Sequence, residues 1–100
     1  MIYLTQLIYI HPGKEETFHQ FEDLALGLLE KYHGKLLLRL RPSQEQLIAG
    51  EQEMPYEIHL VSFATEKDFD AFKQDKEREH FLHLKDASVS KILLIQGAAL

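Results

Sequence analysis

The spacing of the apolar residues switches repeatedly between a period of two and a period near 3.6, and the order of these switches restricts the fold most. Alternation of apolar residues is typical of strands, whereas apolar residues three and four positions apart indicate one buried face of a helix. The two-residue period predicts four strands, at residues 2–10, 35–41, 56–63 and 89–96. The helical period predicts two helices, from residue 14 to about residue 32 and from residue 65 to about residue 79.

This order of elements, with mostly short connections, predicts an α+β domain with the ferredoxin-like β-α-β-β-α-β arrangement. In that arrangement both helices cover one face of a four-stranded antiparallel sheet with the strand order 4-1-3-2, so the first and third strands are central. A chain of 100 residues has the length of one ordinary domain. No linker divides it, so we expect a single domain at residues 1–100.

Residues at the element ends support these boundaries. Gly34 follows the last apolar turn of the first helix, where a left-handed cap is expected. Thr65 and Asp68 have the spacing of a capping box at the start of the second helix. The connection at residues 43–55 is long for so small a domain, which indicates a function or a partner contact there.

The sheet face that turns away from the helices is predicted to be unusually poor in polar residues. The first strand contributes Tyr3, Thr5, Leu7 and Tyr9 to it, and the third strand contributes Glu57, His59, Val61 and Phe63. A soluble protein seldom leaves a contiguous apolar patch of roughly several hundred Å² open to water. We therefore expect this face to pack on a second copy of the chain, to line a ligand cleft, or to do both.

Five segments of the chain together resemble the dimeric α/β-barrel superfamily. They are HPGKEETF at residues 11–18, YHGKLLLR at 32–39, PYEIHLVSF at 55–63, ATEKDFDAF at 64–72 and SVSKILLIQG at 88–97. They look closest to a small branch of uncharacterised domains related to antibiotic-biosynthesis monooxygenase-like proteins. The resemblance implies a homodimer in which two sheets meet face to face. Relatives include cofactor-independent monooxygenases, muconolactone isomerases, haem-degrading enzymes and stress-responsive proteins, so the resemblance implies no single activity.

Charged residues on the second and third strands form the main candidate site. If these strands pair, Arg39 and Arg41 lie beside Glu57 and His59. The guanidinium groups could bind a carboxylate substrate, and His59 could act as a general base or acid near neutral pH. The alternative is structural: Arg39 and Glu57 form a cross-strand ion pair, and His59 only donates a hydrogen bond.

We assign roles to seven residues of this candidate site. Those expected to take part in chemistry are His59, Arg39 and Tyr9, and those expected to contact a ligand are Arg41, Glu57, Tyr3 and Phe63. Aromatic residues at strand spacing serve packing more often than chemistry, so Tyr3 and Tyr9 also have that simpler interpretation.

A second candidate is the pair His80 and His83, which are three positions apart and would share one face of a helix. With His11 or Glu79 they could hold a zinc or iron ion. No clear third ligand accompanies them, and surface histidines are the simpler interpretation. We therefore expect no metal and no cofactor.

The amino-acid composition excludes several kinds of site and argues against two kinds of partner. The absence of cysteine excludes disulfides, thiolate metal sites and a cysteine nucleophile, and it agrees with a cytoplasmic location. A formal net charge of −5 argues against nucleic-acid binding. No apolar run approaches the roughly 20 residues of a membrane span, so we expect no membrane partner.

The leading interpretation is a homodimeric barrel that encloses a small apolar cleft with polar groups at one end. We expect it to bind a small aromatic or carboxylated molecule, with cofactor-independent oxidation or isomerisation as the candidate chemistry. The rival is a non-catalytic structural or regulatory dimer. A concave pocket that contains His59 and an arginine would favour ligand chemistry. A dry interface filled by Tyr3, Leu7, Tyr9 and Phe63 would favour the rival.

Overall fold

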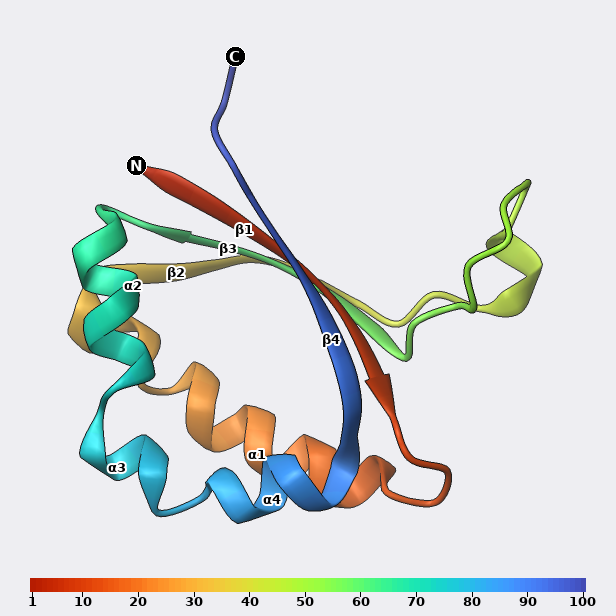
Figure 1. The fold of residues 1–100 in the computed structure, drawn as a ribbon, viewed down its shortest axis with the longest axis horizontal. Coiled ribbons are helices and arrows are strands. Elements are labelled where there is room, and N and C mark those ends of the chain that lie inside the picture. Colours follow the sequence, from red (N-terminus) through yellow and green to blue (C-terminus); the bar gives the residue numbers. More distant parts are fainter.

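The computed structural model describes all residues, 1–100, as one four-stranded sheet with helices on one of its faces (Figure 1). The strands are β1 (Ile2–Ile10), β2 (Gly34–Leu40), β3 (Glu57–Phe63) and β4 (Val89–Gly97). The helices are α1 (Glu15–Leu26), α2 (Glu66–Lys73), α3 (Lys76–Glu79) and α4 (Leu82–Ser88), with short 3-10 helices η1 (Leu29–Tyr32) and η2 (Gln44–Gln46). None of the helices has the length and apolar character needed to cross a membrane.

The strand order β2-β3-β1-β4, with every neighbouring pair antiparallel, is the predicted ferredoxin-like order. Strands β1 and β3 are therefore central, and each is hydrogen-bonded to a neighbour on both sides. The predicted fold class is confirmed.

The sheet register shows which strand residues face the helices, and it corrects one prediction. Leu4 lies opposite Val61 and Ile8 lies opposite Glu57, and directly opposed residues share a face. Leu4 and Val61 pack in one core cluster with helix residue Phe69. The expectation that Glu57, His59, Val61 and Phe63 lie away from the helices was therefore wrong. All four are buried on the helix side, which we call the helix face.

The opposite face of the sheet, here called the open face, is more apolar than predicted. Its members, by register, include Tyr3, Thr5 and Leu7 of β1, Leu38 and Leu40 of β2, Ile58 and Leu60 of β3, and Leu93 and Ile95 of β4, beside the polar Lys35, Ser62 and Lys91. A register shift between Leu36 and Leu38 turns Leu36 toward the helix face and leaves Leu38 and Leu40 on the open face. About half of the surface of these last two leucines is exposed.

The ends of the first helical segment differ from the prediction. The α-helix ends at Leu26, and the left-handed residue before β2 is His33, with φ of 58°, rather than Gly34. Gly34 is needed for a different reason: a Cβ atom there would lie 2.8 Å from Cε1 of Phe63. Thr65 is the N-cap of α2, because its hydroxyl accepts a hydrogen bond from the backbone N–H of Asp68. The Asp68 carboxylate accepts from the same hydroxyl, so the pair makes half of the predicted capping box.

Replacing Gly34 by alanine should lower the free energy of unfolding by about 1–3 kcal/mol, the usual cost of overpacking a core. The added methyl group would meet Phe63, which is only 1% exposed and cannot move freely. Urea unfolding measures the change. Gly97→Ala is the matched control, since nothing lies within 4 Å of a Cβ at that position. Equal stabilities of the two variants would contradict this packing.

Candidate functional site

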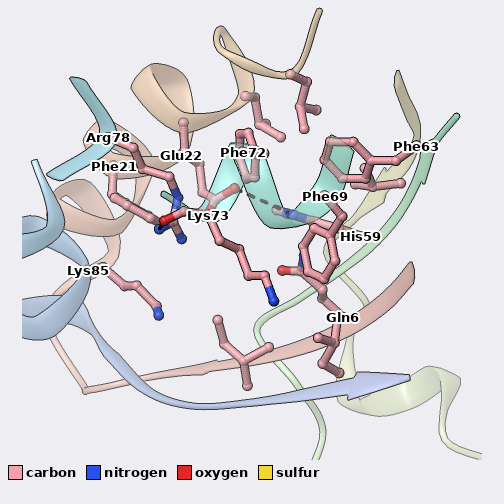
Figure 2. Close-up of a pocket in the computed structure, with 16 residues that line it drawn as sticks. Gln6, Phe21, Glu22, His59, Phe63, Phe69, Phe72, Lys73, Arg78 and Lys85 are labelled. Atoms are coloured by element: carbon pink, nitrogen blue, oxygen red, sulfur yellow. Dashed lines mark hydrogen bonds and ion pairs between the residues drawn. The ribbon is translucent and has the colours of Figure 1, made fainter. Parts of the chain in front are cut away.

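A cavity of about 230 Å³ lies between the helix face of the sheet and the helices (Figure 2). Its apolar lining consists of Phe21, Ala25, Leu26, Leu29, Val61, Phe63, Phe69, Phe72, Ile92 and Leu94. Its polar lining consists of Gln6, Glu22, His59, Lys73, Arg78 and Lys85. Leu94 on the edge strand β4 and Lys73 at the end of α2 are its most exposed lining residues and mark where it opens to solvent.

Glu57 anchors a charged cluster beside this cavity. Its carboxylate is fully buried and accepts hydrogen bonds from Nε of Arg39 at 2.8 Å, Nε of Arg41 at 2.6 Å and Nε2 of His59 at 2.7 Å. Arg39 adds a second bond through a terminal nitrogen at 3.2 Å. Both oxygens of the carboxylate are therefore occupied by donors from β2, from Arg41 just beyond its end, and from β3.

These donors decide the ionisation of Glu57. Burial by itself would raise the pKa of a carboxyl group, but the hydrogen bonds from His59, Arg39 and Arg41 outweigh it and lower the pKa of Glu57 to about 2. Glu57 is consequently ionised at neutral pH and can only accept hydrogen bonds. Since Nε2 of His59 lies 2.7 Å from it, that nitrogen must carry the hydrogen.

The other ring nitrogen of His59 turns toward the first helix. Nδ1 of His59 lies 3.5 Å from Oε2 of Glu22, and this contact is drawn in Figure 2. Glu22 is 6% exposed and sits on the apolar stripe of α1, four residues after Phe18 and three before Ala25. Burial raises the pKa of Glu22, and the positive neighbours His59 and Arg39 offset this only in part.

His59 and Glu22 both line the cavity. Nε2 of His59 donates to Glu57, so Nδ1 is the ring nitrogen that remains on the side of Glu22. A positioned imidazole of this kind can serve as a general base or a general acid.

The structure brings four of the seven predicted site residues together and separates the others. Arg39, Arg41, Glu57 and His59 form one hydrogen-bonded cluster. The ion pair between Arg39 and Glu57, which the structural alternative expected, is present. Both arginines donate to Glu57, and neither lines the cavity.

The predicted aromatic residues fall on different sides of the sheet. Phe63 lines the cavity and packs against the rings of Phe69 and Phe72. Tyr3 and Tyr9 do not line it. The Tyr9 hydroxyl donates to the backbone oxygen of Glu53 at 2.8 Å, so the long connection before β3 covers this tyrosine.

Five polar residues of the cavity were absent from the predicted site: Gln6, Glu22, Lys73, Arg78 and Lys85. Glu22 carried a usable signal, since a glutamate inside an apolar helical stripe must be buried or at its edge. Arg78 and Lys85 carried none, because they lie in charged stretches that look like solvated helix surface. His80 and His83 are not part of the cavity, and no three histidine, aspartate or glutamate side chains gather closely enough to hold a metal ion.

Comparison with known proteins identifies the fold. No family model matches the chain, and no curated protein matches it. A protein of unknown function from Rhodopseudomonas palustris is similar in structure with a TM-score of 0.83 and 16% identity, over 99% of this chain and 82% of that one. A Nitrosomonas europaea protein, provisionally assigned as an antibiotic biosynthesis monooxygenase, gives 0.71 and 11%, over 100% and 99%.

A third similar structure is described as having a ferredoxin-like fold. A dabb family protein with a ferredoxin-like fold from Mesorhizobium loti gives a TM-score of 0.67 and 17% identity, over 99% of this chain and 96% of that one. The monooxygenase-like and dabb structures are of the kind that the sequence resemblance implied. The chain therefore has the ferredoxin-like fold, shared over its full length with structures from several bacteria.

Proposed function

We propose that the chain binds a small organic molecule in the cavity and transfers a proton to or from it through His59 and Glu22. The observation that carries the proposal is a fully buried imidazole at the cavity wall whose Nε2 is fixed by a buried carboxylate. An acidic partner fixes the tautomer of a histidine and leaves the opposite nitrogen free for proton transfer, as in other enzymes that use such a pair.

The proposed chemistry needs no group that the chain lacks. His59 and Glu22 would remove a proton from a carbon next to a carbonyl group and return it at another position, which is an isomerisation. The same removal is also the first step of a cofactor-independent oxidation by molecular oxygen. The apolar walls of the cavity would favour such steps, because a low-dielectric site strengthens interactions with developing charge.

Cavity size and composition support ligand binding over a purely structural role. A pocket that contains His59 and an arginine, Arg78, was the feature expected to separate the two interpretations. At about 230 Å³ the cavity is below the roughly 300–1,000 Å³ typical for drug-sized ligands. We therefore propose a ligand smaller than a typical drug.

We further propose that two copies of the chain pair through the open face. Leucines and isoleucines occupy all four strands there, and those on the edge strands, Leu38, Leu40, Leu93 and Ile95, are exposed. Contiguous apolar surface of this kind marks an interaction site on soluble proteins. The proposed ligand site lies on the other face, so pairing would leave it accessible.

Filling the cavity should abolish ligand binding without unfolding the protein. Ala25 lines the cavity and is 6% exposed, so Ala25→Leu places three extra carbon atoms in it. A compound at ten times its Kd should raise the melting temperature of the wild type by about 5 °C and leave that of the variant unchanged. Thermal shift assays over a panel of small aromatic and aliphatic compounds measure this.

Ala71→Leu is the matched control, because Ala71 is an exposed helical alanine outside the cavity. It should keep the wild-type response. A wild type that responds to no compound of the panel would favour the rival role, a structural or regulatory dimer. An Ala25→Leu variant that responds like the wild type would place the ligand elsewhere.

A further inference from the structure

Three basic side chains from three different helices meet around the cavity. They are Lys73 of α2, Arg78 of α3 and Lys85 of α4, here called the cationic set, and all three line the cavity (Figure 2). The only carboxylate in the lining is Glu22, so basic groups outnumber acidic groups there. The cavity is therefore positively charged inside a chain whose formal net charge is −5.

The partners of the cationic set within the protein are incomplete. Lys73 lies 3.4 Å from the exposed carboxylate of Asp70 and stacks over the ring of Phe69. Arg78 and Lys85 form no ion pair. Lys85 is partly buried all the same, and a lysine without a partner is rarely drawn below the surface.

Arg78 has a donor that nothing in the protein satisfies. Its Nε atom is buried and has no hydrogen-bond partner, and its NH1 group makes only a long bond of 3.4 Å to the backbone oxygen of Lys73. A buried donor left without an acceptor costs about 1–3 kcal/mol, or more when it is charged. Nearly all buried donors in proteins have an acceptor, so a buried donor without one needs an explanation.

The backbone around Arg78 is held firmly in place, so the unsatisfied donor is not the result of a loose segment. Asp75 caps α3 and accepts the backbone N–H of Arg78 at 2.9 Å. The same carboxylate is held by the hydroxyl of Tyr32 and by Nζ of Lys31. The ring of Phe72 lies under the guanidinium group at 5.3 Å.

We propose that the ligand is a small monocarboxylate with an apolar body, and that Arg78 and Lys85 receive its carboxylate. The guanidinium fork matches a carboxylate in geometry, and its NH1 group makes only one long bond within the protein. The body of the ligand packs against Phe21, Phe63 and Phe69, which turns its other end toward His59. This inference rests on the proposed function, since it assumes that the cavity is the ligand site.

Arg39 and Arg41 cannot take this role. Each donates to the buried carboxylate of Glu57, and neither lines the cavity. Arg78 and Lys85 do line it, and no carboxylate lies within ion-pair distance of either. The arginine that recognises the ligand is therefore not one of the two that the sequence pattern indicates.

Pairs of probes that differ only in charge test the inference. Benzoate and 3-phenylpropionate are titrated against benzamide and 3-phenylpropionamide by isothermal calorimetry with the full chain. The wild type should bind each carboxylate about tenfold or more tightly than its amide. Arg78→Gln and Lys85→Gln should each weaken carboxylate binding by about tenfold and leave amide binding unchanged.

Lys76→Gln is the control, because Lys76 lies on the same helix as Arg78, is exposed and does not line the cavity. It should bind like the wild type. If carboxylates and amides bind equally, or if neither Arg78→Gln nor Lys85→Gln changes the preference, the inference is wrong while the ligand site itself stands. If neither kind of probe binds the wild type at millimolar concentration, the proposed function fails and this inference with it.

Discussion

Glu57→Gln should lower the free energy of unfolding by about 3 kcal/mol, the largest loss that we expect from any single isosteric change in this chain. The carboxylate is fully buried and accepts bonds from Arg39, Arg41 and His59. A neutral amide would remove the one carboxylate that both guanidinium groups contact. Arg41 is half exposed and Arg39 a quarter exposed, so water limits the loss to the lower end of the range for buried pairs.

Urea unfolding at neutral pH measures this change, and Glu51→Gln, in the exposed connection before β3, is the control. The pH dependence adds an independent check. The pKa of Glu57 falls from an ordinary 4.5 to about 2 on folding, so its stabilisation is fully present above pH 4.5 and is lost as the pH falls toward 2. The stability difference between wild type and Glu57→Gln should shrink over that interval. A constant difference would mean that Glu57 is not ionised in the folded protein.

Leu7→Glu should convert the proposed dimer into a monomer. Leu7 lies on the central strand β1, opposite both Ile58 and Leu93 on the open face. A carboxylate there would be buried without a partner in the dimer but could reach water in the monomer. The cost of about 3 kcal/mol or more corresponds to a dissociation constant raised by about two orders of magnitude.

Sedimentation velocity over a micromolar concentration range measures the effect, starting from a protomer mass of 11.7 kDa. Ile48→Glu is the control, because Ile48 is fully exposed in the connection between β2 and β3 and should leave the dimer intact. A wild type that stays monomeric at 100 μM would overturn the proposed pairing, as would a dimer that survives Leu7→Glu.

The periodicity of the sequence was sufficient to predict the strand order. It did not show which face of the sheet the helices cover. Alternation shows that Glu57 and His59 share a face with Val61 and Phe63, yet it does not say which layer covers that face. Their charges suggested the side away from the helices. The structure buries them because Arg39, Arg41 and Glu22 supply partners, and the fully apolar Ile58 and Leu60 are left on the open face.

Only the part of the candidate site that strand pairing brings together could be predicted from the sequence. The neighbourhood of Arg39, Glu57 and His59 follows from the pairing of β2 with β3, since Arg39 lies directly opposite His59. Glu22, Arg78 and Lys85 reach the cavity from separate helices, and their meeting depends on how those helices pack on the sheet. The packing of helices on a sheet produces no periodic pattern in the sequence, so these contacts could not be predicted from it.

The ring nitrogens of His59 report most directly on whether this cavity is a ligand site. In ¹⁵N-histidine-labelled protein, His59→Gln identifies the resonances of this ring among the six histidines. A panel of small aromatic and aliphatic compounds, charged and neutral, is then added. We expect that a binding compound shifts the Nδ1 resonance of His59 and leaves those of exposed His80 and His83 unchanged. A compound that binds without moving His59, or a panel in which nothing binds, would contradict it.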